Sequence, residues 1–361
     1  MPDPFGSFQW ICNHTVLPQC NLIFSQLYRA ESPPLTTLFP DESEFFTEFN
    51  IVSDPSAAPT CRPGNPHTDA VTGRPLQSAR SSREDPIVQA ARSVAGTGVG
   101  ANCEIPRVGQ RDSPGDIALI VLSALSLLMA IILSVTASRR KAAVGRVELR
   151  FLLFLYGIHC VFQILTISSL FEQGGLGLSV MSSIHVAFVA TLFWVLLGNG
   201  LIATQFVEDG TAAALAPLIL FAILFFIPTL YIGLDTSLGW TSVFRFDTDS
   251  PDELKNITLF VLTLIWPAAA AFLYTIIMLY ITLVVLKETK PALLYFGAFA
   301  LFAGAQVVFF LASQPLCNTS NGKVNSAFLA TLLESASVGV LYLAWKSITE
   351  DDWGEEVYGI Y

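Results

Sequence analysis

The sequence has few of the residues on which chemistry inside a membrane could depend. It contains 4 His, and only His159 and His185 lie in long apolar stretches. A catalytic zinc site needs about three converging protein ligands, so this scarcity disfavours a zinc hydrolase. No Asp lies inside a predicted span, which excludes the paired aspartates of an intramembrane protease. The last span has no Lys near its middle, which excludes a retinal protein.

Long apolar stretches are what the sequence does have. A helix of roughly 20 apolar residues crosses a hydrocarbon core about 30 Å thick. The stretches lack the alternation and hairpin turns of a barrel, and only helices or closed barrels satisfy backbone groups in lipid. The sequence therefore predicts an all-α polytopic membrane protein, a bundle of seven transmembrane helices. We place the spans at 117–137, 151–170, 180–206, 212–234, 257–286, 292–313 and 326–345.

Basic residues predict the orientation of this bundle, because cytoplasmic loops carry an excess of Lys and Arg. The densest basic cluster, from Arg139 to Arg150, follows the first span. If that loop is cytoplasmic, the N-terminus is lumenal and the C-terminus is cytoplasmic. The candidate glycosylation sites Asn13, Asn256 and Asn318 all fall on the predicted lumenal side, in agreement. The first 30 residues lack a basic start followed by a clean apolar core, so we expect the first span to act as the signal anchor.

The chain outside the spans divides by composition. Residues 102–346 contain the seven-helix domain, residues 1–28 form a lumenal segment with two cysteines, and residues 347–361 form an acidic cytoplasmic tail. Residues 29–101 are rich in Pro, Ser, Thr, Arg and Gly. Such a stretch buries too little apolar surface to offset its ordering entropy, so we predict that it is largely disordered and forms no folded ectodomain.

The cysteines on the lumenal side are candidates for disulfide bonds, since such bonds persist in oxidising compartments. Cys12 and Cys20 are close enough in sequence to close a small loop, and Cys103 could pair with Cys317. All of the 6 cysteines except Cys160 lie on the predicted lumenal side. That leaves an odd number to pair, so the connectivity stays open.

Polar groups inside the spans are candidate functional residues, because they are costly in lipid and normally face the bundle interior. Glu334 in the seventh span stands out. We expect it to bond to Gln306, to Asn199 or to a neighbouring Ser. A proton or ion relay would need a second acidic group within reach, and none is evident.

Small residues and prolines in the spans are packing signals. Ala300 with Gly304, and Ser335 with Gly339, lie four positions apart on one helix face, a spacing that lets neighbouring helices approach closely. Pro267 is expected to kink the fifth span.

Seven spans with an external N-terminus also describe receptors. However, the loop after the third span reads Glu208-Asp209-Gly210 without an Asp-Arg-Tyr pattern, and the seventh span lacks an Asn-Pro-x-x-Tyr turn. A seven-helix receptor or small-solute transporter remains the alternative to the interpretation that follows.

Five groups of residues stand in the order and spacing of one known family. They are Phe5-Gly6-Ser7-Phe8 with Ile11-Cys12 and Leu17-Pro18-Gln19-Cys20, Ala142 to Glu148, Trp194 to Leu197 with Glu208 to Thr211, Ala303 to Val307, and Thr349 to Trp353. Together they cover residues 5–21 and roughly 102–353. The sequence thereby resembles the fungal chitin synthase export chaperones. The segment from about 30 to 100 has no counterpart in the usual member of that family.

The resemblance implies a non-enzymatic chaperone of the endoplasmic reticulum membrane. Such a protein helps a multispan chitin synthase to fold and to leave for the cell surface, and so supports chitin synthesis and cell-wall organisation. The partners implied are chitin synthase, export coat adaptors and membrane lipid; we expect no cofactor and no nucleic acid. Candidate partner contacts are the polar groups in and beside the spans, namely Asn199, Glu208, Asp209, Gln306, Glu334, Glu350, Asp351 and Asp352.

Overall fold

The computed structural model describes the helices of the membrane domain and part of the N-terminal segment. The described residues are 5–8, 11–12, 15, 17–29, 116–140, 144–168, 170–171, 175–241, 243–244, 255–320, 324 and 326–349. The predicted disordered segment lies outside them from residue 30 onward, as does the acidic tail from residue 350. Asn13 and Cys103 are also outside them, and the side chains of Cys317 and Asn318 are not described.

Among the described residues, 7 helices are long and apolar enough to cross a membrane, which confirms the predicted seven-helix fold. The fifth span is one continuous helix that contains two π-helical turns, η2 and η3. In chain order the elements are α2 (Pro18–Arg29), α6 (Ile117–Arg139), α7 (Arg146–Thr166), α8 (Leu176–Ala203), α9 (Ala212–Leu238), α10 (Ile257–Phe260), η2 (Val261–Ile265), α11 (Trp266–Tyr280), η3 (Ile281–Val285), α12 (Thr289–Leu311), α13 (Ser313–Thr319) and α14 (Ser326–Thr349).

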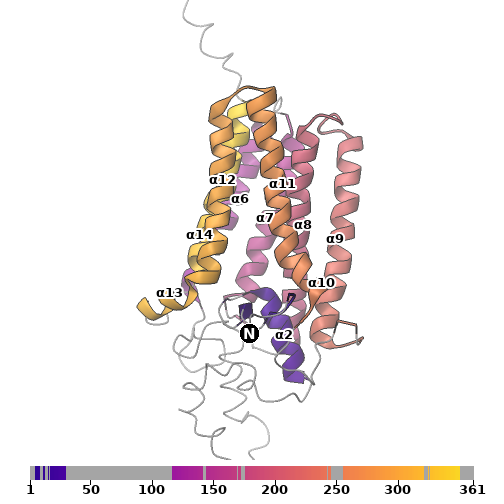
Figure 1. Cartoon of the computed structure of the whole chain (residues 1–361), viewed down its shortest axis with the longest axis vertical. Helices are drawn as coiled ribbons and strands as arrows, with labels where there is room; N and C mark the ends of the chain where they lie inside the picture. Colours follow the sequence, from indigo (N-terminus) through magenta and orange to yellow (C-terminus); the bar gives the residue numbers. More distant parts are fainter. Residues whose placement is uncertain are drawn as a thin grey trace, which may run out of the picture.

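Helix α8 is the centre of the bundle. It packs against α7, α9 and α11, whereas α6 packs between α7 and α14, and α12 pairs with α14 (Figure 1). Its glycines explain how two of these helices, α9 and α11, pack closely against it. A Cβ added to Gly200 would lie 2.9 Å from the ring of Tyr274 on α11, and one added to Gly198 would lie 2.3 Å from Leu218 on α9. Small residues therefore bring the neighbouring helices close on more than one side, as is common in membranes.

The fifth span shows how the chain accommodates Pro267, where the sequence predicts a kink. Proline has no N–H and its ring crowds the carbonyl four residues earlier, so a regular α-helix is disfavoured there. The turn just before it widens, and the N–H of Trp266 donates to the carbonyl of Val261, five residues back. The Trp266 indole then donates to the carbonyl of Ala190 on α8 at 3.1 Å. The proline thus produces a π-turn, and the helix stays continuous.

The ends of two other spans are fixed by acidic side chains. Asp116 precedes α6, and its Oδ1 accepts a hydrogen bond from the N–H of Leu119 at 3.0 Å. Burial raises the pKa of this carboxyl, while that hydrogen bond opposes the shift. Helix α9 continues past the predicted boundary at residue 234 to Leu238. Asp235 therefore lies inside the helix, and its carboxylate accepts hydrogen bonds from both the backbone N–H and the hydroxyl of Thr241.

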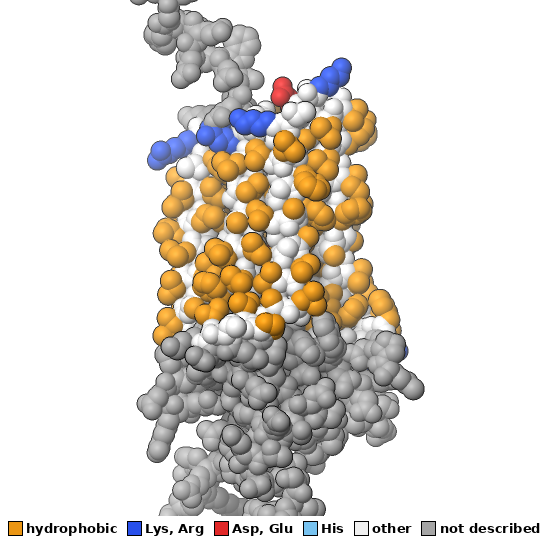
Figure 2. Space-filling model, turned by 60° about the vertical axis from the view of Figure 1, so that its left-hand side comes forward, with side chains coloured by type: hydrophobic (Ala, Val, Ile, Leu, Met, Phe, Trp, Pro, Cys, Tyr) orange, Lys and Arg blue, Asp and Glu red, His pale blue; other side chains and the backbone are white. Residues whose placement is uncertain are grey.

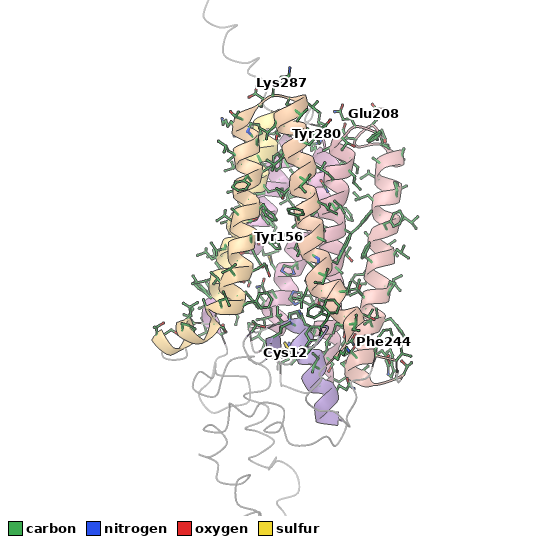
Figure 3. All side chains as sticks on the ribbon, in the orientation of Figure 1. Cys12, Tyr156, Glu208, Phe244, Tyr280 and Lys287 are labelled. Carbon is green, nitrogen blue, oxygen red and sulfur yellow. A yellow bond between two sulfur atoms is a disulfide. The ribbon has the colours of Figure 1, made fainter. Side chains whose placement is uncertain are left out.

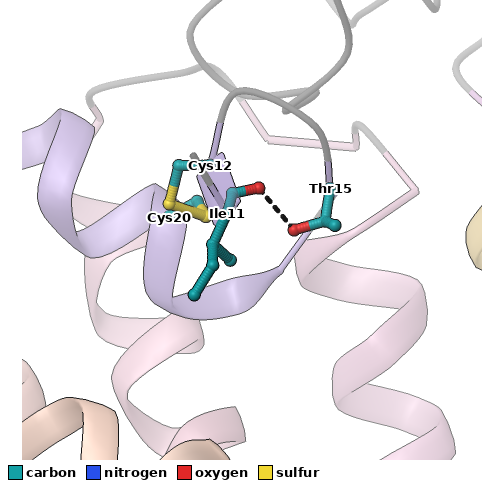
Figure 4. Close-up of a disulfide and its surroundings, with 4 residues drawn as sticks. All are labelled: Ile11, Cys12, Thr15 and Cys20. Carbon is teal, nitrogen blue, oxygen red and sulfur yellow. Dashed lines mark hydrogen bonds between the residues drawn. A yellow bond between two sulfur atoms is a disulfide. The ribbon is translucent and has the colours of Figure 1, made fainter. Parts of the chain in front are cut away.

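The N-terminal segment packs on one end of the bundle. A disulfide joins Cys12 to Cys20, and the Thr15 hydroxyl donates to the carbonyl of Ile11 at 2.7 Å (Figure 4). Asn21 on α2 donates its side-chain amide to the carbonyl of Thr166 and to the hydroxyl of Ser182. The apolar side chains of this segment join those of α8, α9 and α10 in one core cluster: Phe8, Ile11, Leu22, Ile23, Val186, Ile232 and Leu259. These contacts cap the bundle at what we call its N-terminal end.

Charge separates the two ends. Described Lys and Arg side chains gather at the end opposite the N-terminal segment, while apolar side chains cover the side of the bundle that Figure 2 shows. We call this the basic end; Lys287 and Glu208 lie there, and Cys12 and Phe244 lie at the other end (Figure 3). Its described basic residues are Arg139, Arg140, Arg146, Arg150, Lys287, Lys290 and Lys346. An apolar band between polar ends is the surface that a membrane-embedded bundle requires.

The two predicted small-residue pairs behave differently. Ser335 bonds to Ser126 of α6, and Gly339 lies close to Met129 of the same helix, so this pair does face a neighbouring helix. The prediction for Ala300 and Gly304 is wrong within the described residues. A Cβ added to Gly304 would meet nothing within 4 Å, and Ala300 is exposed, because this face of α12 points away from the bundle.

These packing differences predict opposite outcomes for two glycine substitutions. In Gly233→Ala, the new Cβ would lie 3.1 Å from Cβ and 3.2 Å from the Cα of Ser183, so α8 and α9 must separate. Overpacking of this kind costs about 1 to 3 kcal/mol. We expect a lower melting temperature for Gly233→Ala in detergent, measured by size-exclusion chromatography after heating. Gly304→Ala is the matched control and should melt like the unmodified protein; equal losses for both would contradict the packing described.

Candidate functional site

The interior of the bundle contains a cavity of about 610 Å³. Helices α7, α8, α12 and α14 line it together with α10, η2 and α11 of the fifth span, and Ile11, Leu17, Pro18 and Gln19 of the N-terminal segment line it as well. Its walls are mostly aliphatic and aromatic, and its polar side chains come from several different helices. Tyr156 marks its position near the middle of the bundle (Figure 3). Pockets of this volume, with a few convergent polar groups, are typical of small-molecule sites.

Two histidines form the first polar group in the cavity wall. Nε2 of His185 lies 3.1 Å from Nδ1 of His159, and Nδ1 of His185 lies 2.7 Å from the hydroxyl of Thr166. That hydroxyl donates to the carbonyl of Phe162, so it accepts the hydrogen bond from His185. With both rings neutral, His159 then donates from Nδ1 to His185. Nε2 of His159 is left as an acceptor, and no hydrogen bond from a described residue reaches it.

The second polar group joins α12 to α14. Gln306 donates from Nε2 to Oε1 of Glu334 at 3.1 Å, which confirms the expected pairing of Glu334 with Gln306. Asn199 is not part of this group. Its side-chain amide donates to the carbonyl of Val195 and, at 3.4 Å, to that of Glu148, nearer the basic end.

Further hydrogen bonds connect α7 to α14. The hydroxyl of Ser335 lies 2.9 Å from that of Tyr156, and Gln163 donates to the hydroxyl of Thr331. Hydroxyl groups were absent from the sequence-based list of candidates, because Ser and Thr are frequent in membrane helices and carry no periodic signal. Only the packing of the helices reveals that Ser335 and Thr331 bond to residues that line the cavity, and that Thr263, Thr275 and Ser337 line it themselves.

At the basic end, hydrogen bonds join the connection between α6 and α7 to the connection between α8 and α9. We call these bonds the loop tie. Asp209 accepts a hydrogen bond from the N–H of Gly145, and Oε1 of Glu148 accepts one from the N–H of Gly210, both at 2.7 Å. The Trp345 indole donates to the carbonyl of Val144 at 2.8 Å. The two loop segments that carry the family resemblance thus contact each other directly.

The two acidic candidates in the connection between α8 and α9 differ in their surroundings. Asp209 is engaged inside the protein, whereas Glu208 is exposed at the basic end (Figure 3). Glu148, which sequence reasoning did not list as a site residue, is buried. A carboxylate at the start of a helix within a basic loop could have signalled its role, because helix N-termini favour negative charge.

The remaining candidates lie outside the cavity. Asn256 is buried and caps α10, and its amide nitrogen donates to the hydroxyl of Thr236 and the carbonyl of Phe244. In this fold that nitrogen is not accessible to a glycan. Within the described ranges, no group of three or more His, Cys, Asp or Glu side chains could hold a metal ion.

Comparison with known proteins identifies relatives. A family model described as chitin synthase export chaperone matches residues 4–358. A chitin synthase export chaperone of Coccidioides immitis is 26% identical over 233 residues, which cover 64% of this chain and 68% of the relative. One of Debaryomyces hansenii is 25% identical over 356 residues, covering 96% of this chain and 90% of the relative. One of Cryptococcus neoformans is 26% identical over 242 residues, covering 65% and 63%.

Several of these matches, including that to Coccidioides immitis, span about two thirds of the length of the relative. No solved structure matches the chain.

Substitutions of two neighbouring acidic residues test whether the loop tie at the basic end holds the first loop closed. Asp209→Ala removes the acceptor for Gly145, and a hydrogen bond to a charged, half-exposed group contributes about 1 kcal/mol. The first loop should then open more often, so trypsin should cleave after Arg139 or Arg140 roughly fivefold faster in the purified protein. Glu208→Ala changes a side chain that takes no part in the tie and should leave the rate unchanged. Equal rates in all three proteins would show that the tie does not hold the loop closed.

Proposed function

Because this chain belongs to the chitin synthase export chaperone family, we propose that it binds a chitin synthase during folding and is required for that enzyme to leave the endoplasmic reticulum. The observation that carries the proposal is the family match over residues 4–358, which includes both the N-terminal segment and all seven spans. It favours this function over the receptor or transporter alternative. Chitin synthesis and cell-wall organisation depend on the same step.

The protein acts in this proposal by binding, not by catalysis. The family is named for a chaperone activity. The polar groups of the cavity are paired across helices, as in Gln306 with Glu334 and His159 with His185. These pairs hold the bundle together, which is a structural role that needs no reaction.

The basic end is cytoplasmic and the N-terminal end is lumenal in this proposal. Seven described basic residues lie at the basic end, from Arg139 to Lys346, while Lys255 lies near the N-terminal segment through its bridge to Ser7. This asymmetry fits the excess of Lys and Arg in cytoplasmic loops. The disulfide between Cys12 and Cys20 lies at the opposite end, consistent with the oxidising lumen of the endoplasmic reticulum.

Contact with the client is proposed on the outer surface of the bundle. Asn199 and Gln306 were candidates for holding client helices, but both are engaged within the bundle. The outward face of α12, with Ala300 and Gly304, has no neighbouring helix at those positions and faces the membrane, where client helices and lipid lie. On the cytoplasmic side, Glu208 is exposed. Together with the tail residues Glu350, Asp351 and Asp352, it offers acidic groups to basic partner surfaces or export coat adaptors.

The function is tested by following a fluorescently tagged chitin synthase in cells that lack this chain. We expect the synthase to stay in the endoplasmic reticulum and cell-wall chitin, stained in parallel, to fall. Restoring the chain should restore both. An unrelated multispan plasma-membrane protein is the control and should reach the surface in either case. Normal delivery of every chitin synthase in the cell would refute the proposal.

The orientation is tested through the glycosylation sites. Asn13→Gln and Asn318→Gln should each remove a glycan, seen as faster gel migration that deglycosylation of the unmodified protein reproduces. Asn256→Gln should not change migration, because the Asn256 amide is buried beside the start of α10. A sequon inserted beside Lys287 should stay unmodified. A glycan at that inserted site would reverse the proposed orientation.

A further inference from the structure

The cavity contains hydrogen-bonding capacity that the bundle itself does not use. Nε2 of His159 has no hydrogen bond from a described residue. Oε2 of Glu334 has none either, since Gln306 donates only to Oε1. Tyr156 lines the same cavity as His159 and Glu334. Its ring stacks on that of His159 at 6.1 Å, and its hydroxyl bonds to Ser335, the residue after Glu334. Unused acceptors in an apolar enclosure are costly unless a donor arrives.

The chemistry of the lining limits what that donor can belong to. None of the lining residues is Lys or Arg, so a phosphate or carboxylate would be desolvated without a counter-charge. A single carboxyl group cannot replace the hydration shell of a divalent cation. A hydroxyl group suits both free positions, since it can donate to Nε2 of His159 and can donate to or accept from the carboxyl of Glu334. The surrounding Phe193, Phe299 and Phe302 suit an apolar body. The ligand is therefore an uncharged, mostly apolar molecule that carries a hydroxyl group.

The cover of the cavity indicates that such a molecule comes from the membrane. At the N-terminal end, Ile11, Leu17 and Pro18 line it, and the disulfide between Cys12 and Cys20 holds this segment together. Toward the basic end, the rings of Tyr274 and Tyr295 meet at 6.2 Å across α11 and α12. A water-soluble ligand would have to pass one of these barriers, whereas a lipid is already at the depth of the cavity.

We propose that the cavity is a binding site for a neutral, hydroxyl-bearing membrane lipid of sterol or single-chain size, whose hydroxyl donates to Glu334 or His159. A volume of about 610 Å³ suits one such molecule and not a two-chain phospholipid. This inference concerns the protein alone and does not depend on the export function.

The site is tested on the purified full-length chain in detergent with two photoactivatable, alkyne-tagged probes, a sterol and a monoacylglycerol. After illumination, crosslinked peptides are identified by mass spectrometry. We expect one probe to label peptides of α7, α12 and α14, and excess of the same unlabelled lipid to remove that label. The probe that labels in this way identifies the source of the hydroxyl. Labelling only on α6 and α9, or labelling that does not saturate with either probe, would overturn the proposal.

Two matched substitutions locate the site. Val189→Trp adds bulk to a residue that lines the cavity, and Val307→Trp adds the same bulk on the outward face of α12. Saturable labelling should fall at least tenfold in the first and stay unchanged in the second. Glu334→Leu removes one acceptor and should weaken competition by the unlabelled lipid severalfold. If Val189→Trp does not fold, peptide mapping and competition on the unmodified protein still decide the question. Equal labelling of folded Val189→Trp and Val307→Trp would overturn the assignment.

Discussion

The cost of an unpaired polar group in hydrocarbon governs this structure. Backbone groups in lipid must be satisfied within the segment, so the spans are helices. Ser and Thr follow the same rule locally, as when the hydroxyls of Thr229 and Thr263 donate to carbonyls one turn earlier. Longer polar side chains pair across helices, as Gln306 does with Glu334. The outer surface is left apolar, and any client contact within the membrane must rely on shape and packing.

Small residues make this pairing geometrically possible. Helix α8 packs closely against α9 and α11 because Gly198 and Gly200 leave room for their side chains. The π-turn before Pro267 has a related effect, since it keeps α11 continuous while the Trp266 indole reaches the carbonyl of Ala190 on α8. Close contact and the cavity adjoin each other, since Tyr274, whose ring meets Gly200, also lines the cavity.

The N-terminal segment and the loop ties act at opposite ends of the same bundle. At one end the amide of Asn21 holds α2 against α8, and the disulfide between Cys12 and Cys20 joins α2 to the residues before it. At the other end Asp209 and Glu148 hold two connections together. A chaperone for a multispan client needs a rigid surface that does not itself unfold in the membrane. Both ties restrict the movement of the spans on which such a surface depends.

The sequence by itself determined the number of spans, the clustering of basic residues at one end and the need of Glu334 for a polar partner, because apolar length and buried charge leave strong local signals. The packing selected Gln306 among the three partners that the sequence allowed. The sequence did not determine which small residues meet a neighbouring helix, so Gly304 was expected to pack and instead faces outward. It also placed Asp209 among the partner contacts, although that carboxylate binds Gly145. Rotation of each helix about its axis decides these matters. In spans that are apolar on all sides, periodicity does not encode that rotation, and only the packing of the whole bundle fixes it.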